Sequence, residues 1–551
     1  MGRIDEIADR YVEDWAALDP AGATEAGVAG HDDEMPDLTP EGYAARAELN
    51  RRVLTEIAGV APADERERAA KAAMQERLGL EVEIADAGED REMNVITSPV
   101  HGLRQTFDLM PLAGEEAASN VAARLERLPR ALDQLRTTLS TDAAAGRVAP
   151  RRQLTACVDQ YREWTGTDVF CGGLVSRIGA GGALGDRLDT AAAGARQAVD
   201  DFAGYVTEEL LPRAGEADAA GLERYQRASR YFLGATVDLA ETYQWAWQEL
   251  ARIEAEMRRV AGQIVPGSTS IDEAAAALDA DPKRRIAGKD AFRRWMQRQA
   301  DEAIAALDGT HFDIPEPVRT IEACLAPTSE GGIYYTPPSE DWSRPGRMWW
   351  AVPPGIDEFA TWREVTTVYH EGVPGHHLQL GQTVYRSELL NRWQRLLCWV
   401  SGSGEGWALY AERLMDDLGY LSDPGARLGM LDGQSLRATR VIIDIGMHLQ
   451  LKIPAGTGFH EGETWTPELC WEFLRGHCRM EEEILRYELL RYLGWPGQAP
   501  AYKVGERMWL AAREEAKARQ GADFDLKAFH AAALDLGSIG LDPLREALTR
   551  L

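Results

Sequence analysis

The chain has 551 residues, of which 45% are hydrophobic and 27% charged, and its 89 acidic and 60 basic residues give a formal net charge of −29. This composition is typical of a globular protein with a sizeable core. The excess of acidic residues argues against a nucleic acid or an anionic membrane as partner. No apolar run approaches the roughly 18 residues that a membrane-spanning helix requires. No nucleic-acid or membrane partner is therefore expected.

The N-terminal sequence and the cysteines bear on the cellular location. The start, MGRIDEIADRYVEDW, mixes acidic with apolar residues and lacks the basic and apolar regions of a secretory signal. The six cysteines form no C-x-x-C pair, which indicates reduced thiols rather than a disulfide framework. Together these features predict a cytoplasmic protein.

Helical periodicity runs through most of the chain. Apolar residues recur at three- and four-residue spacing among Ala, Arg, Glu and Gln, which favour helices, in the ranges 41–58, 189–213, 221–262 and 288–307. Ser270 precedes Glu273 by three residues and predicts a helix start there. We find no repeat of 30–50 residues, which argues against a helical solenoid.

The composition changes near residue 325, where Gly, Pro and aromatic residues become frequent. Two short β-prone pieces, Ile333–Thr336 and Met348–Val352, predict a small β-ribbon near 333–352. We therefore expect a mainly α-helical protein with two helical halves, 1–310 and 311–551, around a deep cleft. The boundary is soft, and one continuous body is the alternative.

Three of the ten histidines lie within eight residues, in the sequence His370-Glu371-Gly-Val-Pro-Gly-His376-His377. A His-Glu pair followed by another His is typical of zinc hydrolases, because imidazole nitrogens bind the metal and the Glu can take a proton from metal-bound water. We expect His370 to be a zinc ligand and Glu371 to be the catalytic base, which would make 311–551 the zinc-binding, catalytic half.

The second histidine comes later than in the usual motif, in which the two are four residues apart. Six or seven residues correspond to about 9–10.5 Å along a regular helix, too far for two imidazoles to share one ion. Pro374 and Gly375 can interrupt the helix and bring a later histidine back. We expect His376 as the second ligand, because it needs the smaller bulge, with His377 as the alternative. The competing interpretation is that both are ordinary surface or supporting residues.

The segment 401–413, SGSGEGWALYAER, predicts a helix that carries Glu405 in its first turn and Glu412 two turns later on the same face. Glu405 follows His377 by 28 residues, a separation that suits a helix–loop–helix return. We expect Glu405 to be the third zinc ligand. The alternative is a glutamate favoured only by the helix dipole.

Two later segments carry polar residues that could take part in the reaction. Arg440, Asp444 and His448 form one polar stripe on an otherwise apolar helix, and charges buried there must be paired or functional. Tyr502 and Lys503 lie between glycines, where a phenol or an ammonium could donate to the oxyanion of a tetrahedral intermediate. We expect catalytic roles for His448 and Tyr502 and substrate-binding roles for Arg440 and Lys503. The alternatives are an internal ion pair and a tyrosine that only packs.

Five segments in order, HEGVPGHHLQ, EGWALYAERL, RATRVIIDIGMH, PGQAPAYKVGE and FDLKAFHAAAL, resemble successive signatures of the bacterial proteins called domain of unknown function 885. The N-terminal segment resembles that family as well, so the resemblance covers nearly the whole chain. More distantly, the arrangement is similar to the gluzincin-like zinc peptidases that include helical oligopeptidases and dipeptidyl carboxypeptidases. The resemblance implies a helical metallopeptidase with zinc on His370, His376 or His377, and Glu405, with Glu371 as base and Tyr502 at the transition state.

These features predict a Zn2+-dependent hydrolase that cleaves short peptides with metal-activated water. The β-ribbon would lie along the cleft and pair with an extended substrate. The alternatives are a zinc amidase that acts on a small non-peptide metabolite and a metal-free helical binding protein. The sequence leaves open the scissile bond, exo- or endo-cleavage and the oligomeric state.

Overall fold

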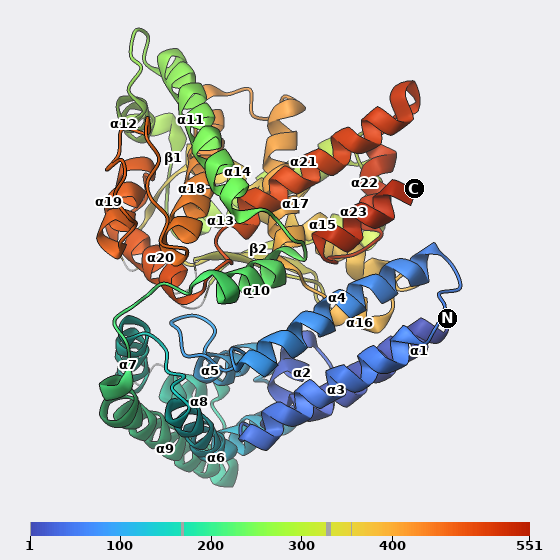
Figure 1. Cartoon of the computed structure of the whole chain (residues 1–551), viewed down its shortest axis with the longest axis vertical. Helices are drawn as coiled ribbons and strands as arrows, with labels where there is room; N and C mark the ends of the chain where they lie inside the picture. The colour runs from blue at the N-terminus through green and yellow to red at the C-terminus, as the bar shows by residue number, and fades with distance from the viewer. Residues whose placement is uncertain (1, 167–169, 327–331, 354, 551) are drawn as a thin grey trace. The chain divides into compact units, whose positions relative to one another are not determined.

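The computed structural model describes residues 2–166, 170–326, 332–353 and 355–550. Most of these residues lie in helices, which confirms the fold class expected from the periodicity (Figure 1). The chain forms two compact units. The first comprises Met1–Pro62, Arg77–Ala220 and Leu490–Trp495, and the second comprises Ala63–Glu76, Gly221–Leu489 and Pro496–Leu551. The sequence placed a soft boundary between the two halves at residue 310. In the structure the main part of the second unit begins at Gly221, because the helix after this residue packs into that unit.

The first unit is built from helices packed around one apolar core. Helix α6 packs against α9, and α7 and α8 pack against α9 as well. The core contains Leu125, Tyr161, Leu188 and Phe202, each almost fully buried. Its helices are α1 (Arg3–Leu18), α2 (Pro20–Ala26), α3 (Pro40–Ala58), α5 (Pro99–Leu109), α6 (Glu115–Ala144), α7 (Arg151–Gly166), α8 (Cys171–Ile178) and α9 (Gly182–Tyr205).

Two helices run through ranges of both units, namely α4 (Glu65–Ala87) and α20 (Glu482–Gly494). The remaining helices belong to the second unit. They are α10 (Leu222–Leu233), α11 (Leu239–Ile264), α12 (Ile271–Ala280), α13 (Lys289–Leu307), α14 (Thr361–Glu371), α15 (His376–Tyr385), α16 (Arg392–Leu396), α17 (Ser401–Asp417), α18 (Pro424–His448), α19 (Pro467–His477), α21 (Ala501–Gln520), α22 (Leu526–Leu534) and α23 (Leu541–Arg550).

A three-stranded sheet in the second unit contains the expected ribbon. Strands β3 (Ile333–Thr336) and β4 (Gly346–Trp350) pair antiparallel, as predicted. Strand β2 (Ile321–Leu325), which the sequence analysis did not identify, pairs parallel with the other side of β4. Strands β1 (Arg285–Ala287) and β5 (Glu358–Ala360) form a separate antiparallel pair.

Glycines allow helices α17 and α21 to pack at backbone distance. A Cβ atom on Gly406 would lie 2.5 Å from the Gly505 backbone, and one on Gly505 would lie 2.2 Å from the Gly402 carbonyl oxygen. Only glycine permits such an approach. The two helices lie next to each other in Figure 1, and the first turns of α17 are thereby fixed against α21.

Among the described residues, no helix has both the length and the apolar character that a membrane crossing requires.

Candidate metal centre

Helix α14 carries the first two residues of the candidate site at its C-terminal end. It packs against α18 and α17, and its side chains Trp362 and Val368 are buried. The helix ends at Glu371, and α15 begins at His376. The connection between them breaks the helix, whereas the spacing predicted a bulge within it.

The connection from Gly372 to Gly375 depends on a tight backbone contact. A Cβ atom on Gly375 would lie 2.0 Å from the carbonyl oxygen of His370, so the turn needs glycine at this position. The indole nitrogen of Trp407, on α17, donates to the Pro374 carbonyl oxygen at 2.9 Å. The turn therefore returns the chain to α17 and places His376 beside His370.

The two predicted histidine ligands, His370 and His376, both lie close to one carboxylate oxygen of the third predicted ligand, Glu405. The Oε2 atom of Glu405 lies 3.4 Å from Nε2 of His370 and 3.5 Å from Nε2 of His376. The two imidazole rings are 4.8 Å apart between centroids and nearly perpendicular, at 89°. Glu371 completes the cluster, because it offers a carboxylate oxygen within 4.8 Å of a nitrogen of each histidine. His370, Glu371 and His376 are all buried.

The other candidate for the second ligand, His377, points away from this cluster. Its Nε2 atom lies 2.7 Å from the carbonyl oxygen of Val318, and its Nδ1 atom lies 2.8 Å from the hydroxyl of Tyr335. Since a carbonyl only accepts, Nε2 carries the proton and Nδ1 accepts from the tyrosine. Burial also lowers the pKa of His377 to about 4. Both nitrogens are used in holding α15 against the sheet and the segment before it.

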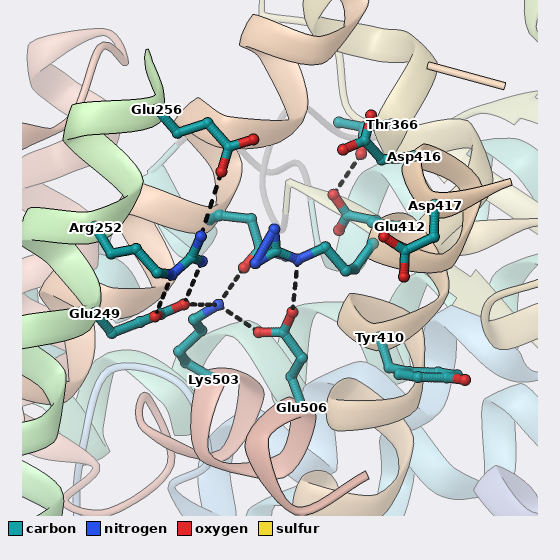
Figure 2. A network of polar contacts seen from close by, with 12 residues as sticks. Glu249, Arg252, Glu256, Thr366, Tyr410, Glu412, Asp416, Asp417, Lys503 and Glu506 are labelled. Carbon is teal, nitrogen blue, oxygen red and sulfur yellow. Dashed lines mark hydrogen bonds and ion pairs between the residues drawn. The ribbon is translucent and has the colours of Figure 1, made fainter. Parts of the chain in front are cut away.

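A second carboxylate orients His370. The Oε1 atom of Glu412 lies 2.8 Å from Nδ1 of His370. The hydroxyl of Thr366 donates to the other oxygen of Glu412, as Figure 2 shows. Glu412 is 1% exposed. A carboxylate on one imidazole nitrogen fixes the tautomer and leaves the other nitrogen free to bind a metal. Sequence analysis placed Glu412 on the same face as Glu405 without giving it a role.

The charges of the cluster are strongly coupled. Burial alone would lower the pKa of His370, but the carboxylates of Glu405 and Glu412 raise it to about 10. Burial alone would raise the pKa of Glu405, but the His370 and His376 imidazoles hold it far below its ordinary value. The pKa of Glu371 is raised, mainly by burial, and the neighbouring histidines oppose this shift only in part. Glu371 therefore retains a proton more readily than an ordinary glutamate.

Arg437, on α18, is a cationic neighbour that the sequence analysis missed. Its charge lowers the pKa of both Glu371 and Glu412. Its Nη1 atom donates to the carbonyl oxygen of Gly433 at 3.3 Å, and within the described part of the chain its guanidinium forms no ion pair. It lies one turn before Arg440, in the polar stripe that the sequence shows, so its position on that stripe was the available signal.

The structure brings Arg440 and Tyr502 together. The guanidinium of Arg440 lies 4.7 Å from the centre of the Tyr502 ring, and its Nη2 atom lies 2.6 Å from Glu488. Cation–π contact and an ion pair thus hold Arg440. The roles in catalysis and substrate binding predicted for the two residues stay predictions.

Asp444 and His448 lie at the C-terminal end of α18 and contact α10. The hydroxyl of Tyr225 and the backbone nitrogen of Gly497 donate to Asp444 at 2.7 and 2.8 Å. His448 stacks on the Tyr225 ring, with 5.6 Å between centroids, and lies 3.8 Å from Asp444. These contacts connect three segments of the second unit, and the catalytic role of His448 remains a prediction.

Lys503 lies in a buried network of ion pairs (Figure 2). Its ammonium lies 3.0 Å from Glu249 and forms short hydrogen bonds with Gln434 and Glu506. Only 2% of its side chain is exposed. The network holds α21 against α11 and α18, and a role for Lys503 in binding substrate remains a prediction.

Comparison with known proteins identifies a family and a fold. The family model described as a bacterial protein of unknown function, DUF885, matches residues 20–548. Two similar solved structures are each described as a "putative lipoprotein". The one from Colwellia psychrerythraea has a TM-score of 0.84 and 22% identity over 100% of this chain and 98% of that chain. The one from Shewanella oneidensis, of unknown function, has a TM-score of 0.76 and 18% identity over 100% of both chains. Among curated proteins, none matches the chain.

These structures correct the expected location. The cytoplasmic location predicted from the N-terminal sequence and the cysteines is wrong by this comparison, because the two solved proteins named above, which share the fold, are each described as a "putative lipoprotein". Reduced cysteines occur in proteins of several compartments, so they could not carry that prediction.

Proposed function

The chain belongs to the DUF885 family of bacterial proteins, and we propose that this member is a zinc-dependent hydrolase that cleaves short peptides. The observation that carries the proposal is the convergence of His370, His376 and Glu405 on one point from three helices. The link to gluzincin-like metallopeptidases is part of the proposal.

The distances from Glu405 to the two histidines suit a tetrahedral ion. Ligand atoms about 2.0–2.2 Å from a tetrahedral zinc lie about 3.3–3.6 Å from one another. The Glu405 oxygen lies 3.4 and 3.5 Å from the two histidine nitrogens. Two imidazoles and one carboxylate, with a fourth position open, are also the ligand set of many catalytic zinc sites. The residues therefore fit zinc by both spacing and chemistry.

Each residue of the cluster has a distinct part in the proposed reaction. When bound, zinc would polarise the scissile carbonyl and acidify a water molecule. Glu412 holds His370 through Nδ1 and keeps Nε2 directed at Glu405. The Oε2 atom of Glu371 is buried and has no hydrogen-bond partner among the described residues. This oxygen can accept a proton from water and pass it to the leaving amine, and the raised pKa of Glu371 suits both transfers.

The sheet favours a peptide over a small amide as substrate. Tyr335, on β3, lies 6.5 Å from His376 between ring centroids, so β3 runs beside the cluster. Strand β3 lies at the edge of the sheet and pairs with β4 on one side only. An edge strand presents backbone donors and acceptors that an extended peptide can pair with.

Metal analysis and a peptide digest test the proposal. We expect about one zinc per chain in the purified protein, and cleavage of short peptides that a chelator abolishes and added zinc restores. A protein that neither contains nor takes up zinc would be a binding protein without metal. A zinc-loaded protein that hydrolyses small amides but no peptide would be an amidase.

A further inference from the structure

We infer that Trp399 forms an apolar wall of the substrate site and selects peptides with a large apolar or aromatic side chain near the scissile bond. This inference rests on the proposed function and names the substrate class that the same site prefers.

Trp399 lies where the candidate metal centre meets solvent. Its ring centroid lies 5.9 Å from that of His376, with the planes at 55°. The residue is nonetheless 44% exposed, whereas His376 is 5% exposed. One part of the indole therefore contacts a proposed ligand, and another part is accessible to a bound molecule.

The ring is fixed in this position from both sides. The residues that flank it, Cys398 and Val400, are buried and anchor the segment before α17. A Cβ atom on Gly404 would lie 2.1 Å from the indole, so the ring rests on the bare backbone one residue before Glu405. These contacts within the protein fix the distance of the ring from the ligand cluster, so no bound molecule is needed to position it.

The exposure of this side chain is unusual for the protein. Among the described residues, Trp399 is the only one of the sixteen tryptophans that is exposed. Tryptophan is highly buried on average, and aromatic rings gain stability from offset or edge contacts with other rings. A fixed, exposed indole beside a reaction centre offers such contacts to a substrate.

Tyr335, another aromatic neighbour of His376, cannot offer the same surface. The hydroxyl of Tyr335 is engaged by His377 at 2.8 Å, and its ring is only partly accessible. Selection of an apolar side chain thus falls to Trp399. An acidic side chain at that position would lose water contacts and find only the indole face in return.

The test uses tetra-alanine and its four variants with a single Phe, each given to the zinc-loaded protein. The variants are Trp399→Ala and Trp399→Phe, and the control is Tyr420→Ala. Tyr420 is 36% exposed and follows the far end of α17, a helix of 17 residues, which span about 25 Å. Binding of the same peptides is measured by calorimetry in the Glu371→Gln background, where the peptide should stay intact.

We expect the wild-type protein to prefer Phe at one position. Trp399→Ala should reduce that preference by about 3- to 10-fold in kcat/KM and in binding, mainly through KM and with unchanged zinc content. Trp399→Phe should lose less, and Tyr420→Ala should match the wild type. If Trp399→Ala loses zinc, the preference for Phe-containing peptides is compared between the wild type and the Trp399→Phe variant instead, and an unchanged preference contradicts the inference.

Two outcomes would overturn the inference, and they differ in what they leave standing. If the wild type shows no preference for Phe, or if the preference is unchanged in the Trp399 variants, Trp399 does not select the substrate. The proposed peptidase function would still hold. Absence of both cleavage and binding for every peptide, in a zinc-loaded protein, overturns the proposed function as well.

Discussion

The Nδ1 atom of His370 lies 2.8 Å from the Oε1 atom of Glu412, which follows Glu405 by seven residues on the same helix. Seven residues are two helical turns, so one face of α17 presents both a proposed ligand and the carboxylate that orients another ligand. This relationship makes α17 the element on which the site depends most.

Glu412→Gln should weaken zinc binding by about 10- to 100-fold, because the amide no longer fixes the charge and tautomer of His370. Competition with a chelator of known affinity measures this change. Asp417→Asn is the matched control, since Asp417 lies on the same helix with 52% of its side chain exposed. Equal zinc affinity in both variants would contradict the orienting role.

Glu371→Gln should keep zinc and lose about 10²- to 10⁴-fold in turnover, because the amide cannot accept a proton. Zinc content and kcat on the same peptide measure the two effects separately. Near-full turnover with zinc bound would assign the base to another residue.

The variants His376→Ala and His377→Ala should distinguish the role of His376 in zinc binding from the role of His377 in stability. His376→Ala should abolish tight zinc binding. His377→Ala should keep zinc but lower the free energy of unfolding, by about 1–3 kcal/mol for each buried partner left without a hydrogen bond. Those partners are Val318 and Tyr335. Zinc analysis and urea unfolding of both variants test this, and the reverse pattern would make His377 the ligand.

Gly375→Ala should destabilise the fold by about 1–3 kcal/mol or more and reduce zinc content, because the new Cβ atom would overlap the His370 carbonyl. Gly476→Ala is the control, since a Cβ atom there would meet nothing within 4 Å. Alanine at that helical position should be neutral or stabilise by up to about 1 kcal/mol. Similar unfolding curves for the two variants would show that the turn tolerates a side chain.

Tyr502→Phe keeps the ring on which Arg440 rests and removes only the hydroxyl. If that hydroxyl donates to the oxyanion, kcat should fall by about 10²- to 10³-fold while zinc content stays the same. An unchanged kcat would leave the oxyanion role to another donor, with His448 as the remaining candidate from the sequence.

Local patterns predicted the local features of the fold well. The range 41–58 corresponds to α3, Pro40–Ala58, and the Ser270 side chain accepts from the backbone nitrogen of Glu273 as expected. The ribbon of β3 and β4 also follows from nearby residues. Strand β2 did not, because its parallel pairing with β4 joins segments that only the tertiary structure brings together.

The site shows the same division between local and distant information. The sequence alone predicted His370, His376 and Glu405 as ligands, because the two histidines share one local motif and Glu405 stands in a second. It offered an internal ion pair as the alternative role of Arg440 but did not point to Glu488, 48 residues later, with which Arg440 pairs. The exposure of Trp399 could not be predicted either, since it depends on which neighbours cover the ring.

The glycine contact between α17 and α21 constrains how Tyr502 can move. Glu405 adjoins Gly406, which touches Gly505, and Tyr502 lies three residues before Gly505 on α21. Because the two backbones are in direct contact, no flexible side chains lie between the helices at this point, and one helix cannot slide over the other. A hinge that swung Tyr502 toward a substrate would therefore carry Glu405 with it. Any approach of the phenol during turnover must come from rotation about its own side-chain bonds and not from the closing of a domain.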